Sequence, residues 1–156
     1  MIATTGNEGL AEDSWWSGLH GVVDASLAAK WFIPEQATAQ SAALLDRLMR
    51  RDFPNGDRGF VVPEVFFAEV VSAVSKQSRN PALLLQCTAM LDQLPVERVE
   101  WSRLPKERCI ELIRSRVGAY DAVYAAIALD RQVPLITSDA RLARALGEPA
   151  WVVLLP

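Results

Sequence analysis

Histidine and cysteine are scarce in this sequence, and their scarcity excludes several kinds of site. His20 is the only histidine, and Cys87 and Cys109 are the only cysteines among the 156 residues. A zinc site needs several such side chains close together, and a serine hydrolase needs a histidine and a Gly-x-Ser-x-Gly turn, which the sequence lacks. The glycine-rich loops that bind nucleotide phosphates are also missing. The sequence therefore disfavours all three classes.

Long apolar runs are absent as well. Glu64, Glu69 and Lys76 interrupt the longest candidate, whereas a membrane span needs about 20 apolar residues, so we expect no membrane segment. There is no secretory leader pattern, and both cysteines have apolar, helix-like contexts, which favours reduced, buried thiols in a cytoplasmic protein. The net charge is -3 and the pI about 5.2, so no overall positive field indicates nucleic-acid binding, although a local basic rim stays open.

Short apolar runs alternate with helical patterns along the chain, and with 51% hydrophobic residues it can bury one substantial core. The strands are expected at 20–25, 60–62, 96–99, 133–138 and 151–154, and the helices at 27–32, 38–51, 63–74, 82–94, 105–117, 119–128 and 140–146. This alternation favours a three-layer α/β/α domain around a central, mostly parallel five-stranded sheet. Residues 1–19 lack either period and are expected to be a flexible extension, which leaves 20–156 as the domain.

Four acidic residues stand where this topology places chemistry. Asp24 ends the first strand, and ligands of parallel sheets bind beyond the carboxyl ends of strands, although capping the next helix is an equally weighted role for it. Glu69 lies mid-helix among apolar residues, and a buried glutamate needs a partner or a metal ion. Asp121 opens an apolar helix, and Asp139 follows the strand beside it. The topology therefore predicts that all four carboxylates face one crevice.

Four carboxylates in one crevice repel one another, and like charges a few ångströms apart raise each other's pKa. A hard divalent cation removes this repulsion. Mg²⁺ and Mn²⁺ prefer oxygen ligands and are commonly held by a few carboxylates together with a phosphate substrate. Such ions activate water and stabilise the attacking and leaving oxygens of a phosphodiester. The sequence thus predicts a Mg²⁺ or Mn²⁺ site for phosphodiester hydrolysis.

Four segments carry a resemblance to a known family. They are 22–26 (VVDAS), 63–70 with Pro63, Glu69 and Val70, 120–124 (YDAVY) and 135–139 (LITSD). In order and spacing they resemble the successive motifs of the PIN domain, in the subgroup of VapC toxins. One departure is Ser72, where relatives often have asparagine.

The resemblance implies a metal-dependent endoribonuclease with a five-stranded parallel sheet, usually a homodimer. It also implies a VapB-type antitoxin that wraps the toxin and represses the operon that the two share. By motif, Asp24, Glu69, Asp121 and Asp139 fall on the acidic quartet that acts in catalysis and metal binding. Ser26 and Ser138 fall on small hydroxyl positions beside the quartet, and Ser138 is suited to orient a ligand carboxylate or a metal-bound water.

We therefore expect a Mg²⁺- or Mn²⁺-dependent ribonuclease toxin that cuts single-stranded or looped RNA. Basic residues that could steer RNA towards the crevice are Lys30, Lys76, Arg116 and Arg141, for each of which an ordinary surface role is at least as well supported.

A second hypothesis is a binding module of the same fold, which acts mainly as the antitoxin's partner or as a co-repressor with a weak site. Its motivation is the adjacent aromatic residues Trp31 with Phe32 and Phe66 with Phe67, which exceed what one core face can bury and could line a groove for an amphipathic helix. A nuclease for DNA ends is a third option, disfavoured because the chain is short.

Overall fold

Five parallel strands form the centre of the molecule in the computed structural model, which describes residues 20–50 and 59–156. The expected extension 1–19 lies outside the described residues, as does the last residue of the helix expected at 38–51. The strands are β1 (Gly21–Val23), β2 (Phe60–Pro63), β3 (Glu97–Val99), β4 (Leu135–Thr137) and β5 (Val152–Leu154), in the order β3-β2-β1-β4-β5. All neighbouring pairs are parallel, so the predicted five-stranded sheet is confirmed.

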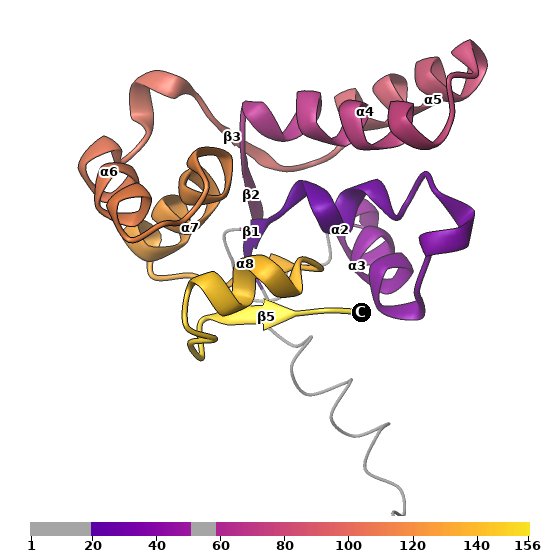
Figure 1. The fold of residues 1–156 in the computed structure, drawn as a ribbon. Coiled ribbons are helices and arrows are strands. Elements are labelled where there is room, and N and C mark those ends of the chain that lie inside the picture. The colour runs from indigo at the N-terminus through magenta and orange to yellow at the C-terminus, as the bar shows by residue number, and fades with distance from the viewer. Residues whose placement is uncertain (1–19, 51–58) are drawn as a thin grey trace, which may run out of the picture.

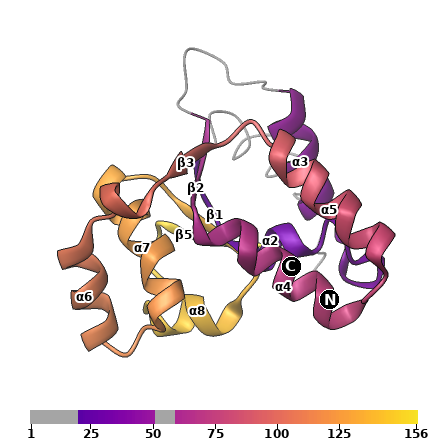
Figure 2. The same cartoon turned by 90° about the horizontal axis from the view of Figure 1, so that it is seen from above.

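Helices cover both faces of this sheet, which confirms the three-layer α/β/α architecture (Figure 1). The helices are α2 (Ala25–Ala29), α3 (Ala39–Arg50), α4 (Val65–Gln77), α5 (Pro81–Gln93), α6 (Lys106–Arg114), α7 (Ala119–Arg131) and α8 (Ala140–Ala145), with short 3-10 turns at Pro34–Gln36 and Trp101–Arg103. Helices α6 and α7 lie on one side of the sheet, and α2 to α5 lie on the other (Figure 2). Strand β4 is shorter than the strand expected at 133–138. It begins at Leu135, because the N–H of Val133 still donates a hydrogen bond to the Ala128 carbonyl at the end of α7.

The central strand β1 has fixed neighbours on both sides. Val22 lies beside Val61 of β2 and beside Leu135 of β4, and all three side chains are buried. A Cβ on Gly21 would lie only 2.5 Å from the carbonyl oxygen of Pro134, so the approach of β1 to β4 requires glycine at this position. The register consequently places the carboxyl ends of β1 and β4 side by side.

Helix α7 is buried on nearly every side because it packs between the sheet and α6. Its buried alanines allow close packing, and they are Ala122, Ala125, Ala126 and Ala128. The N-terminus of this helix points its first turn towards the ends of β1 and β4, where Asp121 emerges.

Neither cysteine forms a disulfide. Cys87 and Cys109 are free and buried, as predicted, and burial raises the pKa of both thiols. Within residues 20–50 and 59–156, no helix has the length and apolar character that a membrane crossing requires.

Candidate active site

Asp24 lies immediately beyond β1 and is almost fully buried, with 5% of its surface exposed. Its Oδ2 atom accepts two hydrogen bonds of 2.6 Å, one from the Ser26 hydroxyl and one from the Thr137 hydroxyl. Burial raises the pKa of Asp24, while these two hydrogen bonds lower it and the neighbouring Asp139 raises it. Asp24 occupies the N-cap position of α2, as the capping alternative expected, but its side chain makes no capping hydrogen bond there. The protein instead uses hydroxyl donors to hold a buried carboxylate in place.

Thr137, which the sequence analysis did not single out as a site residue, joins the two strand ends. Its hydroxyl donates to Asp24 and accepts a hydrogen bond of 2.9 Å from the backbone N–H of Asp139. The Ser26 hydroxyl makes a parallel link, because it accepts a bond of 3.2 Å from the N–H of Ser138. The signal for Thr137 is weak in the sequence: it is a hydroxyl residue at the last position of a strand that pairs with the strand before Asp24.

Ser138 differs from the other hydroxyl residues of this network. Its Oγ atom is buried and has no hydrogen-bond partner among the described residues. A buried polar atom without a partner is uncommon in native proteins and calls for an explanation, such as a bound ion or water. The predicted supporting role of Ser138 is compatible with this unpaired hydroxyl.

Asp139 has a second role that the sequence analysis did not foresee. Its Oδ1 atom accepts hydrogen bonds from the N–H groups of Arg141, at 2.8 Å, and Leu142, at 3.1 Å, and so caps helix α8. The Oδ2 atom lies 3.5 Å from the Arg141 guanidinium. One oxygen of Asp139 is therefore committed to the helix, and the other faces charged neighbours.

Glu69 reaches the crevice from α4 and is half-buried, as predicted. Its Oε2 atom accepts a short hydrogen bond of 2.5 Å from the hydroxyl of Tyr124, which is completely buried. Burial raises the pKa of Glu69; the Tyr124 hydrogen bond lowers it, and Asp24 and Asp121 raise it. Burial and the adjacent Glu69 likewise raise the pKa of Tyr124, so this phenol stays protonated and remains a donor. The partner expected for a buried glutamate is thus a tyrosine from α7.

Asp121 lies in the first turn of α7, and its side chain is 26% exposed. Burial raises its pKa, as do Asp24 and Asp139, while the Arg141 guanidinium lowers it. The Nη2 atom of Arg141 is 3.8 Å from Asp121 Oδ2, in addition to its contact with Asp139. Each of the four predicted carboxylates thus acts electrostatically on, or is acted on by, at least two of the others, and no such effect links Glu69 with Asp139.

The chemistry of this donor set suits a hard divalent cation. The carboxylates supply oxygen ligands, and the unpaired hydroxyl of Ser138 lies beside them. Among the described residues, Arg141 is the cation that offsets the repulsion between these carboxylates. In residues 20–50 and 59–156, no three histidine, cysteine, aspartate or glutamate side chains stand in the arrangement of a metal site.

Arg141 is also the one of the four predicted RNA-steering residues that forms an ion pair with a site carboxylate among the described residues. The others stand elsewhere: Lys30 follows α2, Lys76 is in the last turn of α4, and Arg116 precedes α7 with a positive φ of 70°. Their proposed contact with RNA stays a prediction.

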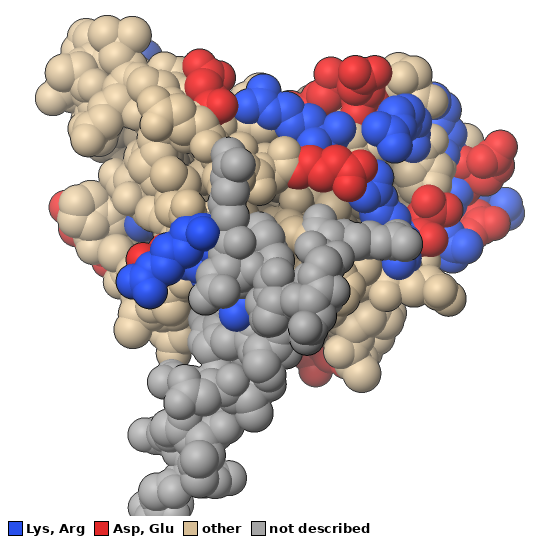
Figure 3. Space-filling model, turned by 180° about the vertical axis from the view of Figure 1, so that it is seen from behind, with Lys and Arg blue, Asp and Glu red and all other residues tan. Residues whose placement is uncertain are grey.

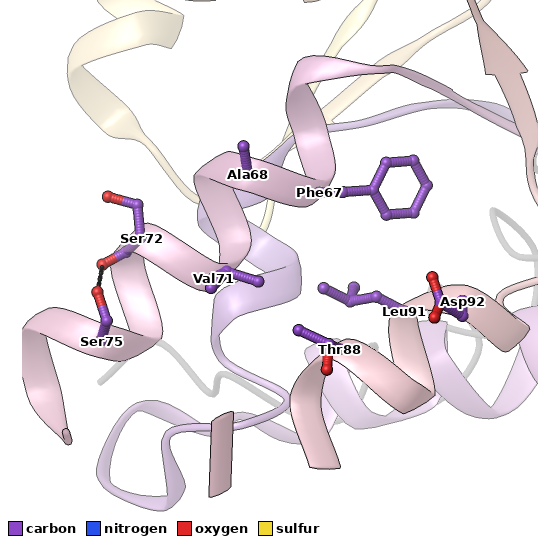
Figure 4. A pocket seen from close by; sticks show the side chains of 8 residues that line it. All are labelled: Phe67, Ala68, Val71, Ser72, Ser75, Thr88, Leu91 and Asp92. Atoms are coloured by element: carbon purple, nitrogen blue, oxygen red, sulfur yellow. Dashed lines mark hydrogen bonds between the residues drawn. The ribbon is translucent and has the colours of Figure 1, made fainter. Parts of the chain in front are cut away.

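The aromatic groove expected for a partner helix is wrong for two of its four residues. Phe32 and Phe66 are 8% and 1% exposed and belong to the core, and Trp31 Nε1–H donates to the Ser41 carbonyl at 2.9 Å. Phe67 packs edge-on against Phe66 and lines a hollow of about 530 Å³ between α4 and α5 (Figure 4). Ser72 lines the same hollow, and its carbonyl accepts a bond from Ser75.

The fold and the site together define a class: a parallel α/β domain that gathers acidic side chains at the carboxyl edge of β1 and β4. The sequence model of the PIN domain matches residues 21–147, which is most of the chain. The protein therefore belongs to the PIN domain family, and the resemblance noted in its motifs is confirmed.

Among individual proteins, the chain is similar to Ribonuclease VapC1 of Mycobacterium tuberculosis. The two are 34% identical over 120 residues, which cover 74% of this chain and 84% of the relative. Two solved structures share the fold. A toxin-antitoxin complex from Klebsiella pneumoniae aligns with a TM-score of 0.60 at 16% identity, covering 85% of this chain and 95% of that chain. VapBC2 from Rickettsia felis, bound to a DNA fragment from its promoter, aligns with a TM-score of 0.59 at 13% identity, covering 88% and 98%.

Proposed function

We propose that this protein is a Mg²⁺- or Mn²⁺-dependent endoribonuclease and the toxin of a type II toxin–antitoxin pair. The observation that carries the proposal is the convergence of Asp24, Glu69, Asp121 and Asp139 at one edge of the sheet, three of them with raised pKa values. Membership of the PIN family and similarity to a ribonuclease VapC1 support the same activity. The reaction is hydrolysis of RNA phosphodiesters.

In this proposal, Asp24 and Asp121 supply the central ligands of the ion, with Glu69 and Asp139 beside them. When bound, the cation lowers the pKa of its water and neutralises phosphate charge. The chain's own residues orient the ligands. The hydroxyls of Ser26 and Thr137 fix the carboxylate of Asp24, because both donate to the same oxygen.

Two further residues act on the outer part of the site. The hydroxyl of the buried Tyr124 binds Oε2 of Glu69, which leaves Oε1 available as an ion ligand. Arg141 balances Asp121 and Asp139 and is exposed, so its long side chain is free to turn towards an RNA phosphate once a cation takes over that balance. Ser138 offers its hydroxyl to a ligand carboxylate or a metal-bound water.

The proposed partners follow from the same assignment. They are an RNA substrate, a VapB-type antitoxin and a second copy of this chain, with action in the cytoplasm. The competing function is a binding module with an idle site, and the observation that favours it is Arg141, which already pairs with two of the four carboxylates. The two functions differ in whether purified protein cleaves RNA.

The test is cleavage of a single-stranded RNA by purified protein in Mn²⁺, with chelator as the blank. We expect Asp24→Asn and Asp121→Asn to abolish cleavage while the circular dichroism spectrum stays unchanged. Asp130→Asn, an exposed change on the same helix as Asp121, is the matched control and should cleave normally. Undiminished cleavage by either site variant would refute the assignment, and no cleavage by the wild type would favour the binding module.

A further inference from the structure

One guanidinium lies between two of the site carboxylates. The Nη2 atom of Arg141 is 3.8 Å from Asp121 Oδ2 and 3.5 Å from Asp139 Oδ2. The two acids belong to different elements, since Asp121 is in the first turn of α7 and Asp139 is the N-cap of α8. The Oδ1 atom of Asp139 is already engaged by the N–H groups of α8, so Oδ2 is the oxygen left to a cation. Arg141 therefore acts as the cation that these two carboxylates share.

The contacts of this guanidinium are loose compared with those of another arginine. Both distances exceed the range of about 2.7 to 3.2 Å for an N–H···O hydrogen bond, and the Arg141 side chain is 78% exposed. Exposed ion pairs of this kind contribute little to stability, because water competes for both partners. Arg131, in contrast, donates two hydrogen bonds of 2.6 and 2.7 Å to Glu97 and is 23% exposed. Arg131 is thus a fixed link between α7 and β3, whereas the Arg141 side chain is suited to change partners.

The backbone of Arg141 is fixed even though its side chain is not. Its N–H donates to Asp139 Oδ1 at 2.8 Å at the start of α8. A guanidinium that leaves the carboxylates therefore stays anchored beside the crevice. Its planar fork matches the oxygens of a phosphate, which it can bind through two parallel hydrogen bonds.

The opposite face of the molecule does not offer a polyanion the same opportunity. On the face turned away in Figure 1, lysine and arginine side chains lie among aspartate and glutamate side chains wherever described residues are visible (Figure 3). Mixed charges of this kind give a phosphate backbone little net attraction. A cation at the crevice itself, such as Arg141, is accordingly the better candidate for holding a phosphate there.

We infer that Arg141 is an exchangeable cation, whose guanidinium leaves Asp121 and Asp139 when a divalent ion binds them and then binds a phosphate of the RNA strand. The inference rests on the proposed metal-dependent nuclease and assigns a phosphate-binding residue to its site. Without the ion, the guanidinium stays with the carboxylates and is not available to RNA. Metal and RNA consequently bind with positive coupling, and each raises the affinity of the other by the same factor.

The measurement is the fluorescence anisotropy of a short, fluorescein-labelled single-stranded DNA, titrated with protein once in chelator and once in Mn²⁺. DNA carries the same phosphates as RNA and lacks the 2′-hydroxyl, so it reports phosphate binding. The proteins compared are the wild type, Arg141→Gln and Arg144→Gln. Arg144 is exposed in the last turn of α8, so its variant removes the same charge from the same helix and is the matched control.

The two conditions should separate the two arginines. In Mn²⁺, Arg141→Gln should weaken DNA binding about tenfold or more, because a bidentate contact to phosphate is lost. In chelator, the same variant should lose less than about threefold, because the wild-type guanidinium is then engaged by the carboxylates. Arg144→Gln should cause one small loss, equal in both conditions. An equal loss in both conditions for Arg141→Gln would reduce Arg141 to an ordinary surface charge and overturn the exchange.

Calorimetric titration of the same proteins with Mn²⁺ separates this inference from the proposed function. A wild type that binds Mn²⁺, but binds DNA equally well with and without it, would overturn the exchange and leave the nuclease assignment standing. A wild type that binds no Mn²⁺ would overturn the proposed function and the exchange together. The expected result is that the labelled DNA tightens Mn²⁺ binding to the wild type more than to Arg141→Gln, by the ratio seen in the anisotropy titrations.

Discussion

The Tyr124–Glu69 hydrogen bond gives a prediction whose size follows from the structure. Tyr124 is completely buried, and its hydroxyl donates to Glu69 Oε2 at 2.5 Å. Tyr124→Phe keeps the ring and removes only the donor. A hydrogen bond to a charged group contributes about 1.5 to 3 kcal/mol, but Glu69 is only partly buried and water can replace part of the loss. We therefore expect a decrease of about 1 to 2 kcal/mol in the free energy of unfolding of the metal-free protein.

Urea unfolding of purified protein in chelator measures this decrease, and for a chain of this length it corresponds to a Tm lower by about 2 to 8 °C. Tyr120→Phe is the matched control, since Tyr120 is 64% exposed on the same helix and should change stability by less than about 0.5 kcal/mol. Combining Tyr124→Phe with Glu69→Gln should cost less than the sum of the single changes. Equal stability of the two tyrosine variants would refute the reasoning.

A second readout separates positioning from simple stability. The Tyr124 hydrogen bond lowers the pKa of Glu69, so its removal raises that pKa further. If Glu69 must be ionised to hold the cation, the acid limb of the pH–cleavage profile should move to higher pH in Tyr124→Phe. A profile that keeps its shape and only loses amplitude would leave Tyr124 with a structural role alone.

Three further predictions concern the same crevice. Thr137→Val removes the donor to Asp24 and the acceptor for Asp139 N–H, so it should cost about 1 to 3 kcal/mol by urea unfolding, while Thr137→Ser should retain most of that stability. Burial and like charges raise the pKa of Asp121, so this residue binds a proton more readily in the folded protein than in the unfolded chain. Its contribution to the free energy of unfolding is therefore fully present below the ordinary carboxyl pKa near 4, and it is lost as pH rises through the raised pKa. The Tm advantage of Asp121→Asn over wild type in chelator should therefore grow from about pH 4 towards neutrality, and an advantage that stays flat would contradict the repulsion. Arg141→Gln should bind Mn²⁺ several-fold more tightly by calorimetry, because the guanidinium no longer competes for the carboxylates, and weaker binding would contradict that competition.

The order of strands and helices could be predicted because each segment carries its own period. The β-branched pairs of β1 and β2 indicate strands whatever surrounds them. Pro63, expected to open the next helix, is instead the last residue of β2, and α4 begins at Val65. The residues at which helices begin and end were harder to predict. The helix expected at 27–32 is α2, which begins at Ala25, and the helix expected to reach residue 117 ends at Arg114. Terminal turns depend on capping contacts that come from elsewhere in the chain.

The four carboxylates could be predicted because their positions at strand and helix ends follow from topology. Their supporting contacts could not. Thr137 meets Asp24 only because Val23 pairs with Ile136, and Tyr124 meets Glu69 only because α7 and α4 face the same edge of the sheet. Nothing local in the sequence sets these registers.

Aromatic residues show the same limit on a smaller scale. Phe66 and Phe67 are adjacent on α4, and the sequence predicted that both could face a partner. The structure buries Phe66 in the core and turns Phe67 outwards, where Arg98 lies 4.4 Å from its ring centroid. Adjacent helical positions point about 100° apart, so only the helix's rotation on the sheet decides which one is buried.

The most direct test of the central claim, that the four carboxylates form one cation site, is calorimetric titration of the purified protein with Mn²⁺. We predict saturable binding to the wild type and to Asp130→Asn, and affinity reduced at least about tenfold in Asp24→Asn, Glu69→Gln and Asp139→Asn. Wild-type protein that takes up no Mn²⁺ at millimolar ion, or site variants that bind as tightly as the control, would contradict the account.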